Sequence, residues 1–150
     1  MLAGIKVEIV RINQKAEYQG TVFDQSVTVR LPDDSKMGLF DKDILVDDEL
    51  TGEECTVVLS LLSTISHVVD HSNPKGIEPN SADPEGWSNH VYSGEVVEIL
   101  EETETGYELR LEVGYGDVVV HLDGRQFNDS PAGCFLEVTA MRSDVYSVLE

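Results

Sequence analysis

The chain has 150 residues, of which 41% are hydrophobic and 26% are charged, a composition typical of a globular protein and not of a disordered one. A single domain of this length buries roughly two thirds of its unfolded surface, so a real core is available. The 29 acidic residues outnumber the 10 basic ones, and the net charge of −19 excludes an anionic ligand from most of the surface.

Alternating hydrophobic and polar residues near the N-terminus predict two β-strands. In "GIKVEIVRI", from Gly4, the aliphatic residues share one face, while Lys6 and Glu8 take the other. In "QSVTVRL", from Gln25, the aliphatic residues point inward, and we expect Thr28 and Arg30 to point outward.

A longer apolar segment follows an acidic turn region. "CTVVLSLLSTISHVV", from Cys55, is apolar enough for a strand that is buried on both sides and bent near Ser63. A helix is the weaker alternative, because β-branched residues fill seven of these fifteen positions.

Residues 71–89 interrupt this series of strands with "NPKG", "EPN" and "DPEG", which predict successive turns. A loop of this length is typically functional or disordered, and a simple linker would not normally carry Trp87, the only tryptophan. Two interpretations stay open. Trp87 either packs on the protein as a structural clasp or anchors a partner at the tip of an exposed loop.

The C-terminal part predicts five short strands: "SGEVVEIL", "YELRLEVG", "DVVVHL", "CFLEVTAM" and "VYSVL", with "RSD" as the last turn. This order of strands and glycine-bounded turns resembles the OB-fold, a small Greek-key barrel, which implies a binding scaffold without naming a ligand. The predicted fold is all-β, with an OB-like barrel in the C-terminal half and additional N-terminal strands packed on it. The predicted divisions are residues 1–70, 71–89 and 90–150, with one composite domain as the alternative.

Two pairs of segments resemble each other. "GIKVEIV" from Gly4 is similar to "GEVVEIL" from Gly94, and the segment from Cys55 is loosely similar to "CFLEVTAMRSDVYSV" from Cys134. The chain is therefore either two similar β units or a single composite domain, because strands of any origin share this kind of pattern.

The acidic composition has two explanations. It resembles that of haloarchaeal proteins, whose carboxylates are screened in a cytoplasm of molar salt, where the Debye length is about 3 Å. The alternative is an acidic inhibitor with a basic partner, either a nucleic-acid mimic or an immunity protein that neutralises a toxin.

Basic residues are concentrated in the N-terminal strands. Residues 1–31 hold four basic and three acidic residues, whereas residues 32–150 hold six basic and 26 acidic residues. A phosphate or another anion would therefore be accepted only near the N-terminus. The candidate binding residues, besides Trp87, are Lys6, Arg11, Tyr18, Phe23 and Arg30.

The best metal pattern is "HVVDH", in which His67 and His71 lie four residues apart, with His90 at the end of the following loop. This spacing lacks the glutamate of the metalloprotease motif, so we predict no metal. A metal-dependent hydrolase built on these histidines is the third hypothesis for function.

We find neither a glycine-rich phosphate loop nor a G-x-S-x-G nucleophile motif in the sequence. We expect Cys55 and Cys134 to be buried reduced thiols. The sequence therefore predicts a soluble, cytoplasmic, non-catalytic binding or assembly module without a cofactor. Its expected partner is a protein of unknown identity, nucleic acid is disfavoured by the charge, and no membrane association is expected.

Overall fold

The computed structural model describes residues 3–18, 21–79, 90–123 and 131–149. These residues form nine strands of one mixed sheet, and the predicted all-β class is confirmed. In the described part, the only helical element is a 3-10 turn, and no helix is long and apolar enough to cross a membrane. The elements are β1 (Ile5–Tyr18), β2 (Thr21–Arg30), β3 (Lys36–Asp41), η1 (Asp48–Leu50), β4 (Glu54–Val69), β5 (Gly76–Pro79), β6 (His90–Glu102), β7 (Gly106–Glu112), β8 (Asp117–Asp123) and β9 (Phe135–Leu149).

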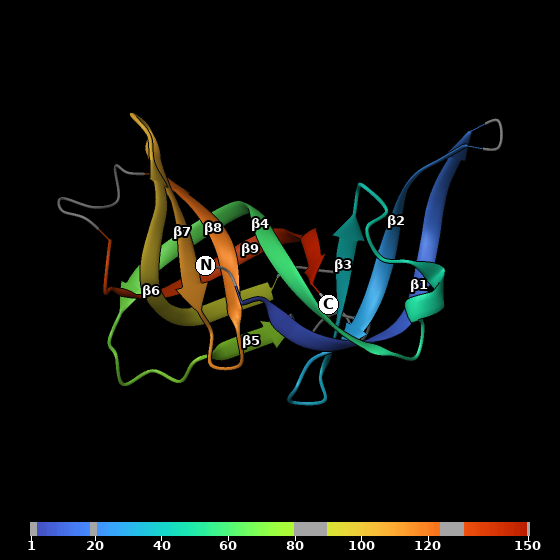
Figure 1. Cartoon of the computed structure of the whole chain (residues 1–150). Helices are drawn as coiled ribbons and strands as arrows, with labels where there is room; N and C mark the ends of the chain where they lie inside the picture. Colours follow the sequence, from blue (N-terminus) through green and yellow to red (C-terminus); the bar gives the residue numbers. More distant parts are fainter. Residues whose placement is uncertain (1–2, 19–20, 80–89, 124–130, 150) are drawn as a thin grey trace.

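The strands close into two five-membered rings that share β4 and β9. Strands β1, β2, β3, β9 and β4 form the first ring, here called barrel 1. Strands β6, β7, β8, β4 and β9 form the second ring, called barrel 2, and β5 is added at the edge of β6. Figure 1 shows the two barrels side by side, with β4 and β9 running from one to the other. The predicted C-terminal barrel is thus completed by β4, a strand of the N-terminal half.

The two rings have the same topology. In barrel 1, Ile9 donates a backbone hydrogen bond to Glu53 and accepts one from Gly52; in barrel 2, Val96 donates to Cys134 and accepts from Gly133. The parallel pairs also match, since β3 pairs with β9 and β8 pairs with β4. The two halves therefore have equivalent strands, and each gives its last strand to both rings.

These hydrogen bonds also correct the sequence alignment of the two halves. Val7 pairs with Cys55 at the place where Gly94 pairs with Leu136. Gly94 therefore corresponds to Val7 and not to Gly4, and Cys134 corresponds to Glu53 and not to Cys55. Alternation with a period of two fixes the buried face of a strand but leaves its register open, which explains the wrong match.

The alternation predicted for the N-terminal strands and for β7 is largely confirmed. Lys6 is exposed, and Tyr107 is half-buried against the core. Thr28 is an exception, because it is completely buried where an exposed side chain was predicted. The buried residues of these segments are Ile5, Val7, Ile9, Val27, Val29, Leu31, Leu109, Leu111 and Val113.

Strand β4 is a strand as predicted, but it is buried on both faces over only part of its length. Val57, Val58 and Leu59 are all buried, where both barrels enclose the strand. Towards its end Ile65 and Val68 are exposed by 60% and 58%. Burial on both sides thus depends on which neighbours cover the strand at each point.

The prediction of a turn at "RSD" is wrong, because β9 runs without interruption from Phe135 to Leu149. Arg142 and Asp144 point to the same side and form two hydrogen bonds of 2.7 and 3.0 Å. Ser143 points the other way, is buried and shares a short hydrogen bond with the hydroxyl of Tyr92. Burial raises the pKa of Tyr92 well above its usual value, and the bond to Ser143 opposes this shift. Arg142, Ser143 and Asp144 therefore all have hydrogen-bond partners although they lie within a strand.

Part of the segment predicted as a loop is a strand. Gly76–Pro79 forms β5 and pairs antiparallel with the start of β6, from Gly76 opposite Ser93 to Pro79 opposite His90. Trp87 lies outside the described residues, so both interpretations of its role stay predictions.

A buried carboxylate fastens the start of β1 to barrel 2. Asp117, 3% exposed, accepts hydrogen bonds from the backbone of Gly4 at 2.9 Å and of Ala3 at 3.2 Å. Arg110 donates to the same carboxylate at 3.0 Å. Gly4 has a φ of +73°, and a Cβ atom there would lie 2.7 Å from the Val57 carbonyl oxygen, so this close approach requires glycine.

Candidate functional site

Two of the predicted binding residues line one cavity. Lys6 on β1 and Arg30 on β2 face a hollow of about 610 Å³, here called the Lys6 cavity. Its other walls come from β1, from the turn after β2 and from the residues that lead into β4. They are Glu8, Leu31, Pro32, Asp34, Gly52 and Glu54.

The two cations differ in how they are held. Arg30 Nε donates to Glu8 Oε1 at 3.0 Å, and Arg30 Nη1 lies 3.5 Å from the backbone oxygen of Asp34. Lys6 lies two residues before Glu8 on the same face of β1 and is exposed. Arg30 is therefore held in place, while the Lys6 ammonium faces solvent at the rim.

The other candidate binding residues are not among the described residues that line the Lys6 cavity. Arg11 is exposed further along β1. Tyr18 and Phe23 belong to β1 and β2, but the structure describes only the course of their backbone. Trp87 falls in residues 80–89, outside the described part.

Barrel 2 has a different arrangement at the corresponding place. Glu95 and Glu112 pair across β6 and β7, as Glu8 and Arg30 pair across β1 and β2. Lys75, just before β5, supplies the missing cation, with Nζ 2.5 Å from Glu112 Oε1 and 3.9 Å from Glu95 Oε1. The hydrogen bond to Glu112 raises the pKa of Lys75.

The hollow beside β5, of about 270 Å³, is lined by Lys75, Ile77, Ser93, Tyr115 and Asp33 among others. The Tyr115 hydroxyl accepts a hydrogen bond from the backbone of Ile77 at 3.2 Å. Burial, and secondly the charge of Asp33, raise the pKa of Tyr115 to about 12. Residues from both halves of the chain therefore line this hollow, and the Tyr115 side chain in it stays neutral at physiological pH.

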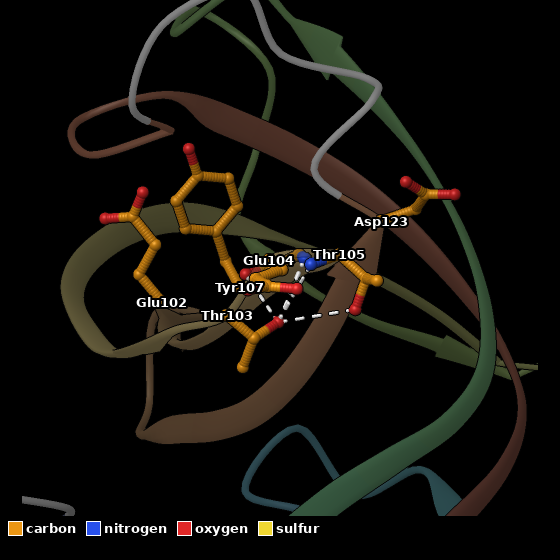
Figure 2. A pocket seen from close by; sticks show the side chains of 7 residues that line it. Glu102, Thr103, Glu104, Thr105, Tyr107 and Asp123 are labelled. Carbon is orange, nitrogen blue, oxygen red and sulfur yellow. Dashed lines mark hydrogen bonds between the residues drawn. The ribbon is translucent and has the colours of Figure 1, made fainter.

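A third cavity, the Thr103 cavity, lies at the end of the β6–β7 hairpin and has a volume of about 550 Å³. The Thr103 hydroxyl accepts hydrogen bonds from the backbones of Gly106 at 3.1 Å and Thr105 at 3.3 Å and so shapes the turn. Figure 2 shows the Tyr107 ring standing between Glu102 and Asp123. With Glu104, the described residues that line this cavity include three carboxylates and no lysine or arginine.

A fourth cavity, the Gln25 cavity, lies at the end of barrel 1 that corresponds to the Thr103 cavity of barrel 2. It measures about 270 Å³ and is lined by Gln25, Ile44, Leu45, Asp47 and Asp48. None of these residues was predicted as a site. Gln25 could have been noticed, because it continues the inward face of "QSVTVRL" and is therefore a polar side chain at a core position.

The three histidines considered as candidate metal ligands do not form a cluster. His67 is exposed on β4, and His90 is buried at the start of β6. His71 places Nε2 at 3.0 Å from the Gly133 carbonyl oxygen and its ring against Phe135. Across the described ranges, no group of three or more His, Cys, Asp or Glu residues could hold a metal ion.

Both cysteines are free and half-buried. Burial raises the pKa of the Cys55 thiol, which keeps it protonated at neutral pH. This agrees with the expectation of reduced thiols, although neither side chain is fully buried.

No known protein family matches this chain, and no curated protein matches it. Among solved structures, the cytoplasmic molybdate-binding protein ModG with molybdate bound is similar over 97% of this chain and 92% of its own, with 13% identity and a TM-score of 0.42. A likeness this distant supports no conclusion about what the chain binds.

Proposed function

We propose that this chain is a non-catalytic binding module and that the Lys6 cavity binds the anionic group of a small polar ligand. The observation that supports this function is the meeting of Lys6 and Arg30, from neighbouring strands, at one cavity. Among their described lining residues, the Thr103 cavity, the Gln25 cavity and the hollow beside β5 each hold at most one lysine or arginine.

The electrostatics of the Lys6 cavity favour a ligand that is only partly anionic. Arg30 is already neutralised by Glu8, so it orients a ligand more than it attracts one. Lys6 provides a further positive charge, while Asp34 and Glu54 accept hydrogen bonds from donors elsewhere on the ligand. A ligand with one anionic group and several hydroxyl or amino groups suits this pattern.

Isothermal titration calorimetry tests this proposal with phosphate, sulfate and molybdate, at a potassium chloride concentration that keeps the chain folded. We expect saturable binding of at least one of these oxyanions. Lys6→Gln and Arg30→Gln should each weaken it about tenfold or more, since a hydrogen bond to a charged group contributes about 1.5–3 kcal/mol.

Lys42→Gln is the matched control. Lys42 is exposed in the loop after β3 and does not line the Lys6 cavity, so this variant should bind as the unmodified chain does. The proposal is wrong if no oxyanion binds saturably, or if Lys42→Gln weakens binding as much as Lys6→Gln does.

A further inference from the structure

We infer that the Gln25 cavity receives the guanidinium group of an arginine side chain presented by a partner protein. This site is independent of the Lys6 cavity, and either proposal can fail without the other. It rests on an unsatisfied acceptor, on two neighbouring carboxylates and on an exposed apolar wall.

The acceptor is Oε1 of Gln25. The side-chain nitrogen of Gln25 donates to Asp41 Oδ2 and to the Val46 carbonyl oxygen, both at 2.8 Å. Both partners are acceptors, so the orientation of the amide is fixed. Gln25 is only 1% exposed, and its Oε1 has no hydrogen-bond partner among the residues that the structure describes. A buried acceptor without a donor is costly, and a donor entering the cavity would remove that cost.

Asp41 holds Gln25 and the loop after β3 in place. Its carboxylate, which is completely buried, accepts hydrogen bonds from the backbones of Leu45 at 2.8 Å and Val46 at 2.9 Å. Together with Gln25 these bonds tie the loop after β3 to β2. In the described part of the chain, the donors that contact the Asp41 carboxylate are thereby used, and none of them satisfies Gln25 Oε1.

The rim supplies negative charge. Asp47 and Asp48 line the cavity and are exposed. The Asp47 carboxylate accepts one hydrogen bond, from the backbone of Glu49 at 2.9 Å, and a carboxylate accepts about four. Among the described residues that line the cavity there are several acceptors and no lysine or arginine, and this favours a cationic donor.

The wall of the cavity is apolar. Ile44 and Leu45 are large hydrophobic side chains that are 38% and 39% exposed and that line the same cavity. They can cover the methylene stem of a long basic side chain while its charged end meets the acceptors. A bare metal ion would leave this apolar surface in water, which favours a side chain as the occupant.

The loop that carries this wall is strained. Ile44 has a φ of +55°, a left-handed conformation that is unfavourable for a β-branched residue. Its side chain is partly exposed, so core packing does not account for the strain. A donor that reaches Gln25 Oε1 must enter between this loop and β2, and the strain at Ile44 makes this loop the element expected to adjust.

The corresponding end of barrel 2 is also lined by acidic residues. Val27 pairs with Leu39 as Leu109 pairs with Val120, so Gln25 corresponds to Tyr107. Tyr107 lines the Thr103 cavity, which is also bordered by carboxylates (Figure 2). Among the described residues of these two cavities, those of barrel 1 combine the acids with a buried unsatisfied acceptor and an exposed aliphatic wall. The planar guanidinium, with five donors, matches several acceptors better than an ammonium does.

The test uses the full chain labelled with ¹⁵N and ¹³C and the blocked peptide acetyl-Gly-Arg-Gly-amide. We expect saturable NMR shifts of the Gln25 side-chain amide and of the Ile44 and Leu45 methyl groups. The same peptide with citrulline, whose side chain is neutral, should leave these signals unchanged. Lysine in place of arginine should bind several-fold more weakly.

Variants of the rim separate the site from the general acidity. Asp47→Asn and Asp48→Asn should each weaken binding of the arginine peptide at least threefold, while asparagine retains the ability to cap η1. Asp43→Asn is the matched control, because Asp43 is an exposed acid of the same loop that does not line the cavity.

Three results would overturn the inference. One is an equal loss of affinity in Asp43→Asn and Asp47→Asn. Another is a set of shifts that spreads evenly over the acidic surface and disappears in 1 M potassium chloride, which indicates charge attraction alone. The third is a response of the Gln25 amide to calcium chloride with none to the arginine peptide, which makes the cavity a metal site.

Discussion

Arg30 and Glu112 occupy the same place in the two barrels, yet they carry opposite charges. Arg30 pairs with Glu8 across β1 and β2, whereas Glu112 lies opposite Glu95 across β7 and β6. Lys75 fills the place of the missing cation in barrel 2. One barrel therefore neutralises this position within its strands, while the other depends on a residue just before an added strand.

Replacing Lys75 by alanine should destabilise the chain, because Glu95 and Glu112 would then face each other without a cation. An exposed ion pair contributes about 0.2–1 kcal/mol, and the repulsion between like charges on paired strands adds a similar amount. The midpoint of urea denaturation, measured at increasing salt, should fall most at the lowest salt concentration at which the chain folds.

The double variant Lys75→Ala with Glu112→Arg provides the control, because it rebuilds in barrel 2 the pair that Glu8 and Arg30 form in barrel 1. We expect it to recover most of the lost stability. If it is no more stable than Lys75→Ala alone, the loss comes from the β5 segment and not from charge.

Tyr115 should ionise late in an alkaline titration, since its pKa is raised to about 12. A group whose pKa is raised by folding binds its proton more tightly in the folded state. Its contribution to stability is therefore complete below about pH 10, the pKa of an unfolded tyrosine, and is lost as the pH rises towards 12. Absorbance at about 295 nm follows the tyrosinate, and Tyr115→Phe should remove one late step from the titration curve. A curve unchanged in this variant would contradict the assignment.

Asp117→Ala should be among the most damaging single substitutions. It leaves the backbone of Ala3 and Gly4 without an acceptor and removes a partner of Arg110, and such a loss at a buried site costs about 2–4 kcal/mol. Chemical denaturation gives the free energy of unfolding. Glu104→Ala, which changes an exposed acid, serves as control and should shift it by less than about 0.5 kcal/mol.

Gly94 should not tolerate a side chain. A Cβ atom there would lie 2.0 Å from the carbonyl oxygen of Glu112, so Gly94→Ala forces β6 and β7 apart and should cost at least about 2 kcal/mol. Gly133→Ala is a useful comparison. Gly133 has a φ of +81° but open space around it, so only backbone strain of about 1 kcal/mol is expected. Equal thermal stability of the two variants would contradict the steric argument.

The net charge of −19 predicts that folding depends on salt. If the composition reflects adaptation to molar salt, circular dichroism should show loss of β structure below roughly 0.5 M potassium chloride, where the Debye length exceeds about 4 Å. A cooperative melting transition at 0.1 M that does not change with salt would instead favour the hypothesis of an acidic inhibitor with a basic partner.

The sequence alone determined the local features of this protein. Alternation identified the all-β class and the inward faces of β1, β2 and β7, because the direction of a side chain in a strand depends only on its neighbours in the chain. The distribution of charge along the chain, and not the alternation, made Lys6, Arg11 and Arg30 the basic candidates for binding, and the structure places Lys6 and Arg30 at one cavity.

Only the tertiary structure decided which strands pair and what lies opposite each side chain. In the tertiary structure β4 and β9 are shared between the two barrels, Thr28 is buried, and β9 runs without interruption through Arg142, Ser143 and Asp144. It also places Gln25 beside a loop of aspartates and aliphatic residues. Strand pairing brings together residues far apart in the chain, and a pattern of period two is compatible with many partners and registers. The inward face of each strand was therefore encoded in the local sequence, whereas the positions of the cavities depend on how the strands pair in the two barrels.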